Sequence, residues 1–98
     1  MTEHSAILHV AGHQLEIRGQ LVFIDARPVD VPPAPMAVLR ALARQPGRVS
    51  SRDELAGILP GTRSGGHAVE MAVTRLRGLL GDPRVVQTVV KRGYRLPV

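Results

Sequence analysis

Cationic side chains near the end of the chain are the residues whose types and spacing could do chemistry. Arg75 and Arg77 stand two apart in a predicted helix, and Lys91, Arg92 and Arg95 follow in the closing segment. A guanidinium can bind guanine O6 and N7 with two hydrogen bonds or clamp a phosphate, and a lysine ammonium binds phosphate as a point charge. The set therefore predicts contact with a polyanion.

The net charge of +5 is concentrated in the same part of the chain. Residues 63–98 hold six Arg, one Lys and two acidic residues, whereas residues 1–49 hold five Arg and four acidic residues. Such asymmetry is typical of a protein that binds phosphates or an acidic partner. The alternative interpretation is a basic face that is simply solvated.

No grouping of polar residues predicts catalysis, a metal site or a cofactor. The sequence has no cysteine, and His9 and His13, on a predicted strand and turn, do not converge as metal ligands. No Ser, His and acid set predicts a nucleophile. The segment Gly61–Gly66 lacks the Gly-Lys-Ser/Thr ending of a phosphate loop. We therefore expect no catalytic residues, no bound metal and no enzyme activity.

The length and hydropathy of the chain predict one domain, residues 1–98. No run of about 18 apolar residues is long enough to span a membrane. The N-terminal residues lack a basic region followed by an apolar stretch, so we expect no signal peptide and a cytoplasmic location.

The first predicted element of the fold that supports these cations is a small N-terminal sheet over residues 5–31. Four runs rich in Val, Ile and Leu, namely AILHV, QLEIR, LVFID and RPVDV, are separated by Gly12, Gly19 and Asp25-Ala26. This spacing predicts an antiparallel meander. The alternation in residues 15–18 predicts one covered and one solvated face.

Three helices are predicted within residues 33–80. The first follows the prolines of VPPAP, where a missing N–H costs nothing in a first turn. The second begins at SRDE, Ser51–Glu54, which has the form of a capping box. The stripes expected to be buried are Met36, Leu39, Leu42 and Ala43 in the first helix and Leu55, Ile58 and Leu59 in the second.

The third predicted helix spans residues 67–80 and is long enough, at roughly 21 Å, to lie in a major groove of DNA. At 100° per residue its apolar residues fall on one face. The buried face holds Val69, Ala72, Val73, Leu76, Leu79 and Leu80, and the opposite face holds Glu70, Met71, Thr74, Arg75, Arg77 and Gly78.

A hairpin over residues 85–97 closes the chain. It joins Val85–Val89 to Tyr94–Pro97 through a link in which Gly93 can take a positive φ. Four strands, three helices and a basic hairpin predict an α+β fold. The expected architecture is a winged helix-turn-helix with a four-stranded N-terminal antiparallel sheet, a three-helix core and a C-terminal β-hairpin wing.

Four segments resemble the winged-helix DNA-binding output domain of OmpR/PhoB-type response regulators: RPVDVPPAPMAVLRAL, GRVSSRDEL, AVEMAVTRLRGLLGD and VQTVVKRGYRL. The resemblance covers nearly the whole chain and is most specific in the third helix and the hairpin. It implies regulation of transcription by sequence-specific binding to double-stranded DNA, with the third helix in the major groove and the wing on the backbone or minor groove. It also implies RNA polymerase as a partner. We expect a monomer in solution that pairs as a tandem dimer on DNA.

The resemblance also implies which residues touch DNA. Thr88 matches a phosphate-contacting threonine at the base of the wing, and Ala72 falls on a helix position that contacts DNA in the family but is expected at the edge of the core here. Together with the cationic residues, the predicted DNA-binding set is His67, Met71, Thr74, Arg75, Arg77, Thr88, Lys91, Arg92 and Arg95. We assign Arg75 to a base or phosphate and Arg77 mainly to phosphate.

The chain departs from the family pattern in places that bear on these contacts. Val90 stands at the usual wing-tip arginine, which leaves Lys91 or Arg92 to replace it, and Thr74 and Gly78 stand where the family often has cations. The loop after the second helix is shorter than in the family and lacks a preceding aromatic residue, which argues against polymerase contact.

A second interpretation treats the domain as a protein-interaction or regulatory module of a larger fused enzyme. The segments RPVDVPPAPM and VVKRGYRL also look like a C-terminal module that some actinobacteria fuse to a uroporphyrinogen-III synthase-like domain. On this interpretation the basic face meets an acidic protein surface, and specific DNA binding has been lost. Duplex binding at low salt discriminates between the two.

Overall fold

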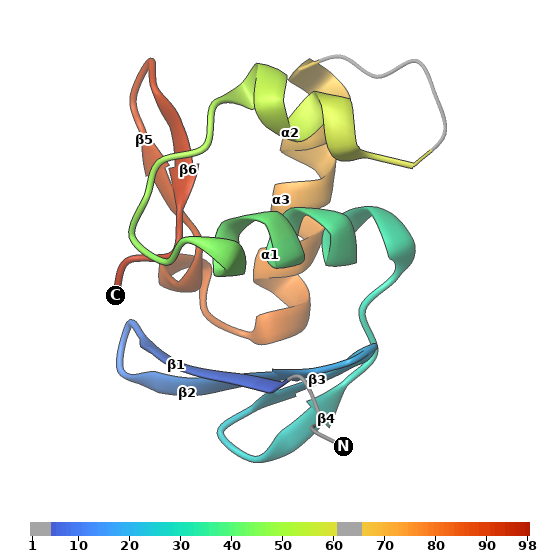
Figure 1. Ribbon diagram of the computed structural model, residues 1–98, viewed down its shortest axis with the longest axis vertical. Helices are drawn as coiled ribbons and strands as arrows, with labels where there is room; N and C mark the ends of the chain where they lie inside the picture. Colours follow the sequence, from blue (N-terminus) through green and yellow to red (C-terminus); the bar gives the residue numbers. More distant parts are fainter. Residues whose placement is uncertain (1–4, 61–65) are drawn as a thin grey trace.

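The computed structural model places an N-terminal sheet on one side of three helices and a two-stranded hairpin at the C-terminal end (Figure 1). It describes residues 5–60 and 66–98. The order of strands, helices and hairpin is the predicted one, so the expected α+β winged-helix architecture is confirmed. The predicted loop over residues 61–65 lies outside the described residues.

The sheet is an antiparallel meander in the order β1-β2-β3-β4. Its inward face places Leu15 opposite Ile24 and Ile17 opposite Val22, and these four side chains are buried under the helices. The predicted alternation is therefore confirmed, since Glu16 is half-buried and Arg18 exposed on the other face. The strands span Ser5–Val10, His13–Arg18, Leu21–Ile24 and Arg27–Val29.

Helix α1, Pro33–Arg44, starts with proline in its first turn and buries Met36, Leu39 and Leu42 as predicted. Val38 is also fully buried, whereas Ala43 is only half-buried. The buried face of α1 is therefore wider than the face that the spacing of its large apolar residues predicted.

Helix α2, Arg52–Ile58, begins at the predicted capping box. The backbone N–H of Glu54 donates to the Ser51 hydroxyl at 3.0 Å, and the backbone N–H of Ser51 donates to the Glu54 carboxylate at 2.8 Å. The helix buries Leu55, but the prediction that Ile58 is buried was wrong, because the helix ends there and the side chain is 42% exposed.

Helix α3, Gly66–Leu80, packs its apolar face against α1, α2 and the turn that follows it. Val69, Ala72, Val73, Leu76 and Leu80 are buried as the helical periodicity predicted, and Leu79 is half-buried. No helix within residues 5–60 and 66–98 is long and apolar enough to cross a membrane.

The wing is shorter than predicted. Its strands are β5, Gln87–Val89, and β6, Gly93–Arg95. Val85 is not in a strand but ends a 3₁₀ turn, Pro83–Val85, because Asp82 caps that turn by accepting from the backbone N–H of Arg84 at 2.9 Å. This turn directs Val85 into the core, where it is fully buried.

A backbone bridge joins the wing to the segment between α1 and α2. The N–H of Ser50 donates to the Tyr94 carbonyl at 2.8 Å, and the N–H of Tyr94 donates to the Ser50 carbonyl at 3.0 Å. The ring of Tyr94 is buried behind this bridge. The hairpin is therefore attached along β6 to the helical core.

His13, at the start of β2, joins the sheet to the C-terminal end of α3. Its Nδ1 lies 2.6 Å from a carboxylate oxygen of Asp25, and its Nε2 lies 2.9 Å from a carboxylate oxygen of Asp82. Since both ring nitrogens face carboxylate oxygens, the protonated ring can donate to both of them at once. The hydrogen bond to Asp25, followed by the one to Asp82, raises the pKa of His13, and Arg84 holds the pKa of Asp82 far below its usual range.

The domain should therefore lose stability as the pH rises through the raised pKa of His13. The folded state binds the proton more tightly than the unfolded chain, whose His has a pKa of 6.5. The stabilisation is thus fully present below 6.5 and is lost as the pH rises through the folded pKa. Thermal unfolding at about pH 6 and about pH 8.5 should show a larger fall in Tm for the wild type than for His13→Gln. Equal falls in the two proteins would contradict the role of this contact.

Candidate nucleic-acid interface

The face of α3 opposite the core exposes the side chains that were predicted to read DNA. Met71 is 60% exposed, and Thr74 and Arg75 beside it are also exposed. Among the described residues Arg75 forms no hydrogen bond or ion pair, so its five N–H donors are available to a ligand. Ala72, in contrast, is buried.

His67 and Glu70 occupy the first turn of this helix. The Nδ1 of His67 lies 4.0 Å from a carboxylate oxygen of Glu70, and the His67 side chain is 84% exposed. The guanidinium of Arg52 approaches Glu70 from α2, since its Nη2 lies 3.2 Å from the other oxygen of the Glu70 carboxylate. Arg52 is not among the residues predicted to bind DNA, and its only signal in the sequence is its place within the capping box.

Arg77 connects α3 to the base of the wing. Its Nε and Nη2 donate to the Val86 carbonyl at 3.0 and 2.6 Å, and Nη2 also donates to the Thr88 hydroxyl at 2.8 Å. Arg77 was assigned mainly to phosphate, but the structure shows that most of its guanidinium holds the protein together. Phosphate contact by Arg77 stays a prediction, and its observed contacts fix the wing relative to α3.

Thr88 gains a defined orientation from this contact. Because its oxygen accepts from Arg77, its hydroxyl hydrogen is free to point elsewhere. Thr88 is exposed, so that hydrogen can be donated to an acceptor outside the protein. This arrangement suits the phosphate contact that was predicted for it.

The cations of the wing differ in their surroundings. Lys91 and Arg92 are exposed in the turn, where Lys91 takes a positive φ of 64° beside the 76% exposed Val90. Arg95 lies on β6, half-buried, and its Nε donates to the Gln87 side chain at 2.5 Å. Lys91 and Arg92 therefore have no partner among the residues that the structure describes, whereas Arg95 is attached to the neighbouring strand.

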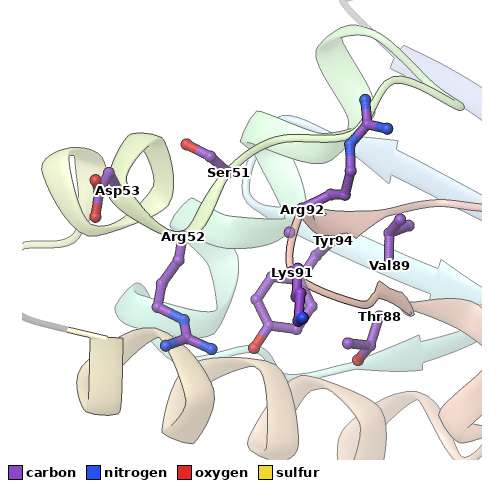
Figure 2. Close-up of a pocket in the computed structure, with 9 residues that line it drawn as sticks. Ser51, Arg52, Asp53, Thr88, Val89, Lys91, Arg92 and Tyr94 are labelled. Carbon is purple, nitrogen blue, oxygen red and sulfur yellow. The ribbon is translucent and has the colours of Figure 1, made fainter.

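A hollow of about 380 Å³ separates the wing from the start of α2. Arg52 lines it from α2, Thr88 and Lys91 line it from the wing, and Tyr94 forms part of its wall. Figure 2 shows that the side chains of Arg52 and Lys91 both point towards α3, whereas Arg92 points away. Arg52 thus lines the hollow and also contacts Glu70 in the first turns of α3.

No part of this surface is arranged for metal binding. Within residues 5–60 and 66–98 no group of three His, Asp or Glu side chains could hold a metal ion. Both ring nitrogens of His13 are already bound to carboxylates. The four-stranded sheet, the three helices and the attached hairpin form a winged-helix domain, with cations on the exposed side of α3 and on the wing.

Comparison with known proteins identifies the family. Residues 26–96 match the family described as "Transcriptional regulatory protein, C terminal", and the chain belongs to it. The chain is 35% identical over 92 residues to the transcriptional regulatory protein CutR of Streptomyces coelicolor, an alignment that covers 92% of this chain and 42% of CutR. The chain therefore spans less than half the length of the curated relatives that it matches.

Solved structures agree with this assignment. The RstA DNA-binding domain of Klebsiella pneumoniae, in a crystal structure with the RstA box, superposes with a TM-score of 0.74 at 26% identity, covering 92% of this chain and 95% of that one. The DNA-binding domain of E. coli CadC gives a TM-score of 0.78 at 24% identity, covering 99% of this chain and 95% of that one. The likeness to CadC is one of fold alone.

Proposed function

We propose that the chain regulates transcription by binding double-stranded DNA in a sequence-specific way. In this proposal α3 enters the major groove, where Arg75, Thr74 and Met71 meet base edges. Thr88 and Lys91 meet phosphates beside the groove. The observation that carries the proposal is that Arg75 is exposed on α3 and has no partner among the described residues, while Arg77 of the same helix holds the wing in place.

The experiment is duplex binding by the 98-residue chain, measured over a range of salt concentrations and combined with selection from random duplexes. About five phosphate contacts per monomer should give a slope of log K against log salt of about −4 to −5. Selection should return one enriched motif. If no duplex binds even near 50 mM salt and an acidic protein binds instead, the interaction-module interpretation replaces this one.

Several finer predictions belong to the same proposal. We infer that the chain is a monomer in solution that pairs in tandem on DNA, acts in the cytoplasm and performs no catalysis. Fusion to a uroporphyrinogen-III synthase-like domain stays a prediction. Contact with RNA polymerase, which the resemblance implies, is untested, and the short loop after the second helix argues against it. Sedimentation with and without a duplex that carries two copies of the selected motif tests the pairing.

A further inference from the structure

The contact between His13 and Asp82 is one end of a chain of hydrogen bonds that leads to the wing. Nε2 of His13, on β2, lies 2.9 Å from one carboxylate oxygen of Asp82, which follows α3. The other oxygen of this carboxylate accepts from the backbone N–H of Arg84 at 2.9 Å and so caps the 3₁₀ turn Pro83–Val85. A single carboxylate therefore joins the sheet to the turn that leads into β5.

The carbonyl that Arg77 binds lies directly after this turn. Val85 and Val86 are both fully buried, so the backbone between the turn and β5 has a fixed course. Nε and Nη2 of Arg77 donate to the Val86 carbonyl, and Nη2 also donates to the hydroxyl of Thr88 in β5. The base of the wing is therefore placed relative to α3 by the same turn that Asp82 caps.

His13 can donate to both of its carboxylate partners only while its ring is charged. The neutral ring keeps one N–H and presents a lone pair at the other nitrogen. Loss of the proton to solvent therefore breaks the contact with Asp25, in the turn after β3, or the contact with Asp82. The other charged groups nearby are Arg27, which acts on Asp25, and Arg84, whose side chain donates to Asp82 at 2.8 and 3.1 Å.

We propose that His13 is a positioning residue for the wing. While its ring is protonated, His13 holds the turn capped by Asp82 against the sheet, and this turn keeps the Val86 carbonyl in place for Arg77. Loss of the proton loosens the turn and the base of the wing within the folded domain. The expected consequence is weaker duplex binding as the pH rises, and this second part rests on the proposed function.

An NMR pH titration of the free 98-residue chain tests the positioning role without DNA. The Arg77 Nε–H and the Thr88 backbone amide should change chemical shift together with the His13 ring. Their common midpoint should lie above 6.5, because the hydrogen bonds to its carboxylate partners raise the pKa of this ring. Neither signal should follow that midpoint in His13→Gln, whereas His9→Gln, which changes an exposed histidine of β1, should titrate like the wild type. Wing signals that titrate equally in the wild type and in His13→Gln, or in neither, would overturn the inference.

Asp25→Asn gives a second readout, which a simple loss of stability would not produce. Asparagine tolerates the positive φ of 50° at this position. The hydrogen bond to Asp25 is the largest cause of the raised pKa of His13, so the variant should lower the midpoint of the ring. If His13 positions the wing, the midpoints of Arg77 and Thr88 should move down by the same amount. A lower midpoint for the ring with unmoved midpoints for the wing would count against the positioning role.

Duplex binding at about pH 6 and about pH 8.5 tests the consequence for function. The measurement is made in a His67→Gln background, because the exposed imidazole of His67 lies on α3 and its own charge can act on DNA. Affinity should fall by about fivefold between the two pH values, and this fall should disappear when His13→Gln is added. Equal falls with and without His13→Gln would refute the link to binding. If no duplex binds at either pH, the proposed function fails, and the NMR titration still decides the positioning role.

Discussion

Replacing Gly93 by alanine should destabilise the domain by roughly 3 kcal/mol and detach the wing from the helical core. Gly93 has a φ of +144°, which side chains other than hydrogen rarely tolerate. An added Cβ would lie 2.0 Å from the Ser50 carbonyl oxygen and 2.9 Å from Cα of Ser51. These are backbone atoms, so relief of the clash requires the Ser50–Tyr94 bridge to open.

Urea denaturation of wild type and Gly93→Ala measures this effect as a fall in the unfolding midpoint. Gly12→Ala is the matched control, because Gly12 also has a positive φ, +83°, but an added Cβ meets nothing within 4 Å. Only the conformational cost, about 1 kcal/mol, should appear in the control. Equal destabilisation of the two variants would show that close packing of the wing on Ser50 is unimportant.

The backbone bridge between Ser50 and Tyr94, which Gly93 permits, is a second attachment of the wing besides Arg77. Arg77 holds β5 through Val86 and Thr88, and the Ser50–Tyr94 bridge holds β6. Two attachments on different strands restrain both the position and the rotation of a short hairpin. The spacing between the wing cations and α3 is therefore set by the fold before any ligand arrives, which lowers the entropy cost of binding.

The elements that sequence predicted well are those encoded by neighbouring residues. The capping box of Ser51 and Glu54 depends on contacts three residues apart, and the buried face of α3 depends on helical spacing. Both are confirmed. The prediction that Ile58 is buried also depended on local spacing, and it was wrong. Local spacing does not show that the helix ends at Ile58, where the side chain remains exposed.

The features that sequence missed join residues that are distant along the chain. His13 and Asp82 are 69 positions apart, and no local pattern indicates that their side chains meet. Arg77 was recognised as a cation of α3, but its contact with the Val86 carbonyl depends on the 3₁₀ turn that precedes β5. Arg52 was missed because the hollow it lines forms only when the wing folds back beside α2.

Replacing Arg75 by alanine should weaken binding to the preferred duplex by about 1–3 kcal/mol, roughly 5- to 150-fold, and relax the sequence preference at one position. Arg75 is exposed on the face of α3 away from the core and forms no hydrogen bond or ion pair with the described residues. Its removal should therefore leave the unfolding midpoint within about 0.5 kcal/mol of wild type. Selection from random duplexes with both proteins measures the change in preference.

Lys91→Ala, measured in the same assay, distinguishes contact with bases from contact with phosphates. Lys91 is exposed at the wing tip, so its loss should weaken all duplexes alike and reduce the magnitude of the salt slope by about 0.9. Arg75→Ala should instead change the ranking of sequences. If Arg75→Ala weakens all sequences equally, as Lys91→Ala should, then Arg75 binds phosphate, and specificity must come from Met71, Thr74 and the shape of the duplex.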